Sequence, residues 1–428
     1  MTYADIILPL PLEGYFTYCV PDTMAPRLQP GCRVRVPLGK TKTYTGLVAA
    51  LHDQVPAGLK TGKEGVKSIV EMMDPGPVLL PQQLRLWQWI ADYYLSSIGD
   101  VYKAALPSGL KAEDDYRPKT ETYVVLADDF RSAQALRAAQ AMLQHAPAQQ
   151  KVLRAYLELA SVSEENPVPQ REITREELMN EAHCTTTVLR QFLDRRILRQ
   201  YEKEVGRIPL GGMPHPEHIK PLSEAQADAY NQILVQQMSK DITLLHGVTS
   251  SGKTEIYIHL IQRALDEGRQ VLYLLPEIAL TVQMMQRLRR VFGDRLGIYH
   301  SRYSDAERVE IWKRQLSDHP YDVILGARSA LFLPFQRLGL VIVDEEHEQS
   351  FKQMDPAPRY HARSAAIILA KLCGAKVLLG TATPSSESYW NAQTGKYGYV
   401  RLDKRYQDMA LPAVEVVDVK DLRRRKMM

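Results

Sequence analysis

A phosphate-binding loop is the clearest chemical signal in this 428-residue sequence. Residues 247–254, GVTSSGKT, fit the pattern Gly-x-x-x-x-Gly-Lys-Ser/Thr, follow an apolar run and precede a helical stretch, EIYIHLIQRAL. Backbone N–H groups of such a loop bind a polyphosphate; here they would come from Gly247, Val248, Thr249, Ser250, Ser251 and Gly252. Lys253 would reach the β- and γ-phosphates, and the Thr254 hydroxyl would bind Mg²⁺. The sequence therefore predicts a site for ATP with Mg²⁺.

An acidic segment after another apolar run supplies the second half of this site. In residues 340–347, LVIVDEEH, Asp344 would hold Mg²⁺ directly or through water, and Glu345 would orient and deprotonate the attacking water. Acidic residues after a strand usually form only a solvated loop, and the preceding phosphate loop is what favours the catalytic interpretation. We therefore predict Lys253, Asp344 and Glu345 as the catalytic residues.

Three further features fit a motor that couples the state of a nucleotide to nucleic acid. GTATPS, residues 380–385, follows an apolar run, so Thr381 and Thr383 would lie at the carboxyl end of a strand and act in coupling. Residues 350–363, SFKQMDPAPRYHAR, mix aromatic and basic side chains, which suits base stacking and phosphate contact, although an ordinary packed loop is the alternative. The predicted DNA contacts in this loop are Phe351, Lys352, Arg359, Tyr360 and His361. Gln226 would read the adenine edge, although a lone helical Gln usually faces solvent.

Hydrophobic patterning indicates three different units around these residues. Residues 1–70 alternate short β-rich runs with turns, which predicts a small β-barrel or sandwich, and a helix over 82–96 would pack on it. A Thr174-x-x-Glu177 capping signal then opens a helix-turn-helix followed by a polar ribbon, the outline of a winged helix. The third unit alternates helical stretches with apolar runs, as a parallel sheet requires: 242–245, 271–275, 323–325, 340–343 and 377–379.

Composition excludes some classes of protein but does not by itself indicate a nucleic-acid partner. The chain has 54 basic and 50 acidic residues, a net charge of +4. Between Cys184 and Arg207, however, basic residues exceed acidic ones, which favours phosphate contact by the winged helix; binding to protein, or simple packing, stays open. Widely separated cysteines without a Cys-x-x-Cys pair favour reduced thiols. With no signal peptide and no run of about 18 apolar residues, we expect a cytoplasmic protein and no membrane partner.

Taken together, these motifs resemble the bacterial primosomal protein N′ (PriA) family, superfamily 2 helicases that restart stalled replication forks. The resemblance covers essentially the whole chain. It rests on ILPLPLEGYFTYCVP and GCRVRVPLGK near the start, WIADYYLSSIGDVYKAALPSGL near residue 100, HGVTSSGKTE, LLPEIALT, HSRYSDAER, ILGARSALFLPF, VIVDEEHE with RYHARSAA, and GTATPS. Other superfamily 2 proteins share the phosphate and acidic motifs but not the N-terminal ones.

The resemblance implies a multidomain fold that combines α/β and β classes. Residues 1–105 would form a small β-barrel-like 3′-DNA-binding domain, 110–205 a winged-helix domain, 206–221 a linker, and 222–410 a RecA-like parallel-sheet helicase lobe 1. Members of the family continue into a cysteine-rich zinc module, a second motor lobe and a C-terminal domain. Residues 411–428 would therefore be the start of that region, and zinc is expected only there.

The same resemblance implies an ATP-dependent 3′-to-5′ DNA helicase that recognises stalled or branched forks and initiates replication restart by primosome assembly. Its partners would be branched and single-stranded DNA with a nascent 3′ end, single-stranded DNA-binding protein and other primosome proteins. Such motors bind ATP between two lobes, so these 428 residues alone are expected to hydrolyse it weakly. The alternative is a scaffold that binds fork DNA without ATP turnover.

Five positions mark the DNA pocket of the family or depart from its pattern. Phe16, Thr17 and Tyr18 fall in the segment that would bind the 3′ end, and some relatives carry Asp where this chain has Thr17. Ser250 stands where Gly is usual, which is tolerated if its backbone is unstrained, and Ser364 stands where Asp is usual.

Overall fold

The structure, a computed structural model, describes residues 2–54, 66–111, 119–208, 212–405 and 419–424. The chain divides into two compact units, one of Met1–Tyr116 with Leu210–Met428 and the other of Arg117–Pro209. Residues 1–105 and 222–410, expected as separate domains, therefore belong to the same unit. Parts of the predicted linker (209–211), of the end of the lobe (406–410) and of the tail (411–418 and 425–428) lie outside the described residues.

An antiparallel sheet in the order β2-β1-β4-β3-β5 opens the first unit. Its strands are β1 (Thr2–Ile7), β2 (Phe16–Val20), β3 (Arg33–Leu38), β4 (Lys42–His52) and β5 (Glu71–Met72). The outer strand β2 also bonds the segment just before β5: the N–H of Cys19 donates to the carbonyl of Lys67 (2.8 Å), and that of Ile69 to the carbonyl of Cys19 (3.0 Å). Because this contact joins the two ends of the sheet, the predicted barrel-like form is confirmed.

Helices α1 (Pro81–Tyr93), α2 (Ile98–Ala105) and α3 (Ser108–Lys111) follow this sheet. The predicted helix over 82–96 is confirmed as α1, which makes polar contacts both with the N-terminal β-region, where the Tyr15 hydroxyl donates to Gln88 Oε1, and with the parallel-sheet part of the unit. The buried amide of Gln83 donates to the carbonyl of Phe332 (2.5 Å) and accepts from the N–H of Leu80 (2.8 Å). The indole N–H of Trp312 donates to the carbonyl of Val78 (2.8 Å). Such buried hydrogen bonds hold the two parts of the unit in a fixed register.

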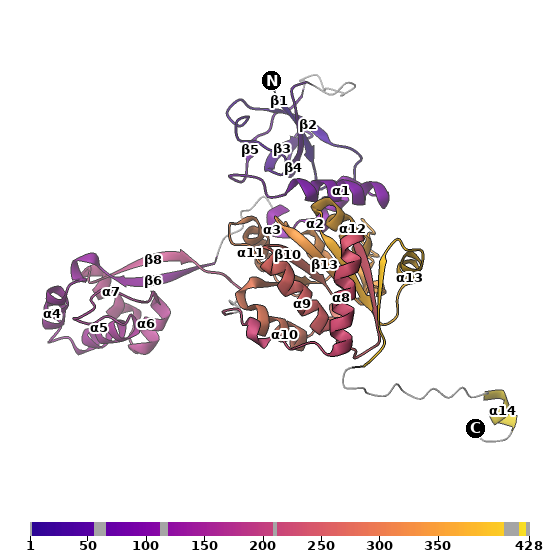
Figure 1. Ribbon diagram of the computed structural model, residues 1–428. Helices are drawn as coiled ribbons and strands as arrows, with labels where there is room; N and C mark the ends of the chain where they lie inside the picture. Colours follow the sequence, from indigo (N-terminus) through magenta and orange to yellow (C-terminus); the bar gives the residue numbers. More distant parts are fainter. Residues whose placement is uncertain (1, 55–65, 112–118, 209–211, 406–418, 425–428) are drawn as a thin grey trace. The chain divides into compact units, whose positions relative to one another are not determined.

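A parallel sheet in the order β11-β12-β10-β13-β14-β9-β15 forms the centre of the rest of this unit (Figure 1). Its strands are β9 (Ile242–Gly247), β10 (Gln270–Leu274), β11 (Leu296–Tyr299), β12 (Val323–Gly326), β13 (Leu338–Asp344), β14 (Lys376–Thr381) and β15 (Gly398–Leu402). The five predicted apolar runs are all strands of this sheet. The sequence did not indicate β11 or β15, because LGIY and GYVRL are short and interrupted by glycine or charge.

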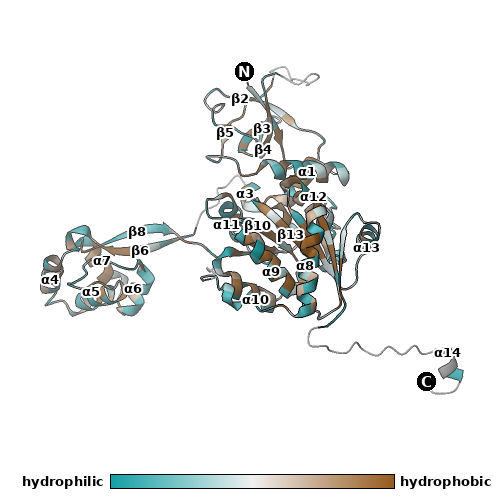
Figure 2. Ribbon diagram, in the orientation of Figure 1, coloured by the Kyte–Doolittle hydropathy of each residue, from teal (hydrophilic) through white to brown (hydrophobic). Residues whose placement is uncertain are grey.

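Helices cover both faces of the parallel sheet. Buried residues of α8 (Glu224–Ser239), α9 (Lys253–Asp266) and α10 (Val282–Phe292) share one core with alternate strand residues. The later α-helices of this unit are α11 (Asp305–Leu316), α12 (Ala362–Cys373), which contacts α1, β13 and β14, α13 (Ser386–Gln393) and, near the end of the chain, α14 (Val419–Arg424). Figure 2 shows hydrophobic residues concentrated on central strands such as β10 and β13. In such a parallel sheet the carboxyl ends of β9, β13 and β14 share one edge.

The second unit is a small antiparallel sheet, ordered β7-β6-β8, with helices packed on it. Its elements are β6 (Thr120–Leu126), α4 (Ala133–Met142), α5 (Pro147–Leu159), β7 (Ile173–Thr174), α6 (Arg175–Glu181), α7 (Thr186–Asp194) and β8 (Leu198–Glu204). The Thr174 hydroxyl accepts from the N–H of Glu177 (3.1 Å), whose carboxylate accepts from the N–H of Thr174 (2.9 Å). The capping box and the winged-helix outline are thus confirmed. Across all the described residues, no helix is both long and apolar enough to cross a membrane.

Replacing Gln83 by Ala tests the packing of α1. The change leaves the buried carbonyl of Phe332 and the N–H of Leu80 without their partners, so the free energy of unfolding should fall by about 2–4 kcal/mol in equilibrium urea unfolding. Arg85→Ala, at an exposed position of the same helix, is the control and should change it by less than about 0.5 kcal/mol. Equal effects of the two substitutions would show that α1 is not anchored by Gln83.

Candidate functional site

The predicted phosphate loop and acidic segment meet in one cavity at the carboxyl edge of the parallel sheet. Strand β9 ends at Gly247 and β13 ends at Asp344, with β14 between them. The cavity is lined by the loop, by the start of α9 and by residues of other segments: Lys220, Gln226, Thr249, Ser250, Ser251, Gly252, Lys253, Thr254, Glu255, Arg287, Asp344 and Glu345. Residues that the sequence assigns to phosphate, metal and water therefore lie together.

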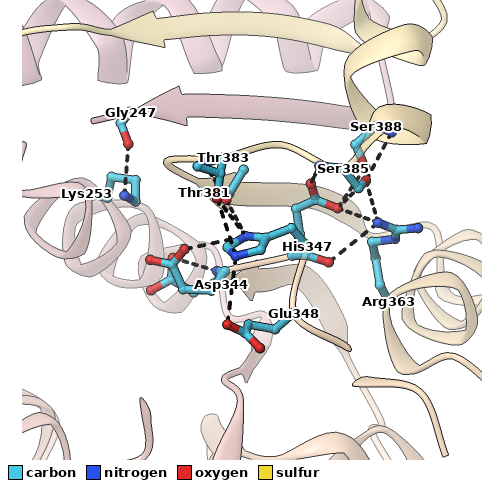
Figure 3. Close-up of polar contacts among 12 residues, drawn as sticks. Gly247, Lys253, Asp344, His347, Glu348, Arg363, Thr381, Thr383, Ser385 and Ser388 are labelled. Carbon is cyan, nitrogen blue, oxygen red and sulfur yellow. Dashed lines mark hydrogen bonds and ion pairs between the residues drawn. The ribbon is translucent and has the colours of Figure 1, made fainter. Parts of the chain in front are cut away.

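The loop itself has the geometry of a phosphate cradle. The Lys253 ammonium donates to the carbonyl of Gly247 (3.0 Å), across the mouth of the loop (Figure 3). Ser250 has a φ of +63°, so the condition for tolerating serine in place of glycine, an unstrained backbone, is not met; a non-glycine residue in this region costs about 1–2 kcal/mol. The hydroxyl of Ser251 is buried and has no hydrogen-bond partner among the described residues. A phosphate oxygen is the kind of acceptor that would satisfy it.

Gln226 lines the same cavity but its amide is turned toward the loop. Its Nε2 donates to the carbonyls of Ser251 (3.2 Å) and Gly252 (3.3 Å), and its Oε1 accepts from the N–H of Ser223 (2.9 Å). Gly252 has a φ of +80°, and a Cβ there would lie 2.1 Å from Gln226 Nε2, so only glycine permits this contact. Gln226 thus holds the phosphate loop in shape, and its contact with adenine stays a prediction.

Asp344 is held by two buried tyrosines that were not among the predicted site residues. The hydroxyl of Tyr257 donates to Asp344 Oδ1 (2.9 Å) and that of Tyr273 to Oδ2 (3.2 Å). Burial, and then the charge of Glu345, raises the pKa of Asp344 to about 6, against the lowering effects of Tyr257 and Lys253. Gly380 leaves room for this arrangement, since a Cβ there would lie 1.8 Å from the Tyr257 hydroxyl. A buried carboxylate of this kind is stabilised by a cation.

The residues around Asp344 fit a magnesium ion bound together with a nucleotide. Thr254 and Asp344 would hold the ion, and the ion would neutralise charge on the phosphate oxygens. Within the described residues no group of three or more His, Cys, Asp or Glu side chains forms a metal cage, so phosphate oxygens would complete the coordination. Arg287, paired with the buried Glu255, adds a second cation to the cavity wall. Nothing in the local sequence around Arg287 indicated this position.

The two threonines predicted for coupling contact the acidic segment through one histidine. The Nδ1 of His347 lies 2.7 Å from the hydroxyl of Thr381, and Nε2 lies 3.4 Å from that of Thr383 (Figure 3). The same ring lies 3.8 Å from a carboxylate oxygen of Glu345. Glu345 itself has a φ of +47°, in the left-handed region. The role of Thr381 and Thr383 in coupling stays a prediction; their contact with His347 of the acidic segment is present in the structure.

The structure of the loop 350–363 contradicts part of its predicted DNA contacts. Phe351 and Tyr360 are each 1% exposed, and the Tyr360 ring packs edge-on against Phe332, so the prediction that these rings stack on bases is wrong for this structure. Burial lowers the pKa of His361 to about 4, and the imidazole is therefore neutral near pH 7. Lys352, whose ammonium lies 4.9 Å from the centre of the Tyr94 ring, and the exposed Arg359 remain the candidate DNA contacts of this loop.

The three residues predicted for the 3′-end pocket differ in their exposure. Phe16 and Thr17 are partly exposed on β2, whereas Tyr18 is 4% exposed and its hydroxyl donates to the carbonyl of Pro37 (3.1 Å). Tyr18 is therefore a core residue, which corrects its predicted DNA contact. The Thr17 hydroxyl donates to Asp5 Oδ1 (2.7 Å), and the other Asp5 oxygen lies 2.6 Å from His52 Nε2. A carboxylate thus lies beside Thr17, supplied by the neighbouring strand.

Comparisons with known families match three successive parts of the chain. Residues 5–107 match the family described as the 3′DNA-binding domain (3′BD) of PriA. Residues 121–205 match the winged helix domain of PriA helicase from Bacteroidota, and residues 223–390 match the DEAD/DEAH box helicase family.

Curated relatives match almost the whole chain. Replication restart protein PriA of Haemophilus influenzae is 33% identical over 98% of this chain and 54% of its own length, and that of Bacillus subtilis is 31% identical over 98% and 58%. Among solved structures, Mycobacterium smegmatis helicase Lhr bound to ssDNA and AMP-PNP matches 46% of this chain and 27% of its own, with 23% identity and a TM-score of 0.32. The chain spans a little over half the length of these two curated relatives. In succession, this chain is therefore similar to a PriA 3′-DNA-binding domain, a PriA winged helix and a DEAD/DEAH box helicase domain, and over almost its whole length to replication restart protein PriA.

Proposed function

We propose that this chain provides the ATP-binding and fork-recognising part of an ATP-dependent 3′-to-5′ DNA helicase that initiates replication restart by primosome assembly. The observation that carries the proposal is the cavity in which loop 247–254 faces Asp344 and Glu345 at one edge of the sheet. The name of the curated relatives, replication restart protein, supports the biological process. The protein would act in the cytoplasm, with single-stranded DNA-binding protein and other primosome proteins as partners; zinc would bind only in the part of its longer relatives that this chain does not span.

The residues of the cavity divide the chemistry of phosphoryl transfer to water between them. The loop N–H groups, the Ser251 hydroxyl and Lys253 would bind the phosphates, with Arg287 beside them. Glu345, beside the metal-binding Asp344, would orient a water and accept its proton. Tyr257 and Tyr273 keep Asp344 in place by hydrogen bonds to both of its oxygens. At the carboxyl edge of the sheet, Glu345 would therefore deprotonate a water only next to the position that a γ-phosphate would occupy.

Branched DNA with a free 3′ end is the proposed nucleic-acid ligand. Phe16 and Thr17, with Asp5 behind Thr17, would contact the end in the N-terminal domain (1–105), and Lys352 and Arg359 would contact single-stranded DNA beside the helicase lobe (222–410). In the winged helix (110–205), the exposed Arg190, Arg195 and Arg196 show no ion pair with any described residue, whereas Arg199 and Lys203 pair with Asp128 and Glu172. The unpaired arginines are the cations that phosphates would neutralise.

A scaffold that binds fork DNA and nucleotide without turnover is the second candidate, because the chain spans a little over half the length of the two curated relatives. Steady-state ATP hydrolysis, with and without forked DNA, separates the two functions when Glu345→Gln is used as the blank. Turnover above that blank supports the helicase motor. Binding of both ligands with turnover equal to the blank supports the scaffold.

We predict that Lys253→Ala weakens binding of a Mg²⁺-bound ATP analogue by at least about 10- to 100-fold, because a charge-assisted hydrogen bond contributes about 1.5–3 kcal/mol. Isothermal titration calorimetry measures the change. Lys371→Ala, an exposed lysine of α12 away from the cavity, is the matched control and should bind like the wild type. Wild-type affinity in Lys253→Ala would remove the phosphate-loop assignment.

The winged helix yields a second prediction. Replacing Arg190, Arg195 and Arg196 together by Gln should weaken binding to forked DNA, and the slope of log affinity against log salt should become shallower by up to about 3, roughly 0.9 for each phosphate that is no longer neutralised. The control replaces three arginines whose charges are already paired, Arg137, Arg154 and Arg171. If both triple variants change the slope equally in fluorescence anisotropy titrations, phosphate binding does not reside on the α7 side.

A further inference from the structure

An ion pair between two helices lies in the wall of the nucleotide cavity, outside the phosphate loop. Arg287 is on α10, and its Nη2 donates to the carboxylate of Glu255, in the first turn of α9. The Glu255 side chain is 10% exposed and that of Arg287 is 41% exposed, and both residues line the cavity. The carboxylate is therefore inside the wall, whereas a ligand can reach the guanidinium.

Part of the Arg287 guanidinium has no partner in this pair. An arginine side chain carries five N–H groups in a planar fork, so it can bind a carboxylate and a phosphate at the same time. Glu255 is its only hydrogen-bond partner among the residues that the structure describes, and Nε and Nη1 donate to none of them. These N–H groups are available to phosphate oxygens, with which arginine forms charge-assisted hydrogen bonds.

The strand order places Arg287 on the side of Asp344 that is away from the phosphate loop. The loop follows β9 and Asp344 ends β13, whereas α10 follows β10, the neighbour of β13 on the side away from β9. Burial, and then Asp344, raise the pKa of Tyr273 well above its usual range, and the positive charge of Arg287 opposes that rise. Because the Tyr273 hydroxyl donates to Asp344 Oδ2, the guanidinium lies near the predicted position of the metal.

A triphosphate bound at this edge of the sheet would extend from the loop toward Arg287. In phosphate-loop proteins the backbone binds the α- and β-phosphates, and the lysine and the metal lie at the β- and γ-phosphates. Lys253 and Asp344 would therefore mark the end of the cavity that takes the γ-phosphate. Arg287, beyond Asp344, would face this γ-phosphate, which a diphosphate lacks.

We propose that Arg287 contacts the γ-phosphate of a bound nucleoside triphosphate and thereby makes the cavity prefer a triphosphate to a diphosphate, with Glu255 as the residue that positions the guanidinium. The inference rests on the proposed function, because it assigns a further residue to the same nucleotide site. The cation would come from the lobe that carries the phosphate loop itself.

Loss of affinity in a variant without Arg287 does not by itself demonstrate this contact. The Glu255 carboxylate would then lie unpaired beside the phosphates and repel them. A double variant that lacks both charges separates the two effects, because the net charge of the wall stays the same. If Arg287 contacts the γ-phosphate, the preference for triphosphate is lost in the double variant as well. If Arg287 only neutralises Glu255, the double variant recovers it.

Calorimetric titrations of the full chain give the dissociation constants of Mg²⁺-bound ADP and of a Mg²⁺-bound, non-hydrolysable ATP analogue. The ratio of the ADP constant to the analogue constant is then compared among the wild type, Arg287→Gln and the double variant Arg287→Gln with Glu255→Gln. Arg290→Gln, at an exposed position of the same helix, is the matched control.

In the wild type and in Arg290→Gln we expect a ratio of at least about tenfold, because charge-assisted hydrogen bonds to the γ-phosphate are possible only with the analogue. In Arg287→Gln and in the double variant this ratio should fall by at least about fivefold. The double variant should still bind ADP within about threefold of the wild-type affinity, since it keeps the phosphate loop and Lys253.

A smaller fall of the ratio in the double variant would overturn the inference, because Arg287 would then serve only to neutralise Glu255. A wild-type chain that binds ADP and the analogue equally would also overturn it, although the proposed function would still stand. If the wild type binds neither nucleotide, the proposed function itself is wrong. Should Arg287→Gln alone fail to fold, the double variant still provides the test, because it leaves neither charge of the pair unpaired in the wall.

Discussion

Three consecutive carboxylates, Asp344, Glu345 and Glu346, lie at the end of strand β13 next to the predicted phosphate loop. Different neighbouring side chains hold each of the three in a different position. Asp344 faces the phosphate loop with both oxygens held by tyrosine hydroxyls. Glu346 is turned away and neutralised by Arg363. Glu345, between them, adopts a left-handed backbone that leaves its side chain on the cavity wall. Without these partners, three neighbouring negative charges at one strand end would repel one another and any phosphate.

The parallel sheet makes this arrangement possible, and the N-terminal domain is built onto it. The strand order puts β14 between β9 and β13, so the loop and the acidic segment are separated by one strand and Gly380 provides space for Tyr257. Between the N-terminal domain and the parallel-sheet part, the side chains of Gln83 and Trp312 donate hydrogen bonds to backbone carbonyls of segments that are far away in the sequence. The N-terminal domain and the lobe that carries the phosphate loop therefore share one packed unit.

Short-range patterns in the sequence predicted much of this fold. The phosphate loop, LVIVDEEH, five of the parallel strands and the Thr174 capping box all depend on residues close together in the chain, and all lie where they were expected. Side-chain direction was less predictable. Phe351 and Tyr360 have the composition of a stacking surface, yet long-range packing buries both rings. The position of Tyr257 near the site could have been predicted from the sequence, because it lies one helical turn after Lys253 on the same face of the helix.

Contacts between distant segments were beyond the reach of sequence patterns. Arg287 enters the cavity from α10, Tyr273 reaches Asp344 from an all-buried strand, and Asp5 meets Thr17 through strand pairing. Each of these three contacts depends on how distant elements pack against one another, and a single sequence does not specify that packing. The sequence also did not separate Glu346 from its acidic neighbours, because only the position of Arg363 and Ser385 in space gives it a different role.

We infer that Asp344 and the phosphate loop form one magnesium–nucleotide site. The most direct test of this inference is calorimetric binding of an ATP analogue to the wild type and to Asp344→Asn, each with Mg²⁺ and with EDTA. We expect from this inference that Mg²⁺ strengthens binding to the wild type by at least about tenfold, whereas Asp344→Asn binds the metal-free analogue normally and gains less than about twofold from Mg²⁺. An equal gain from Mg²⁺ in both proteins would contradict it.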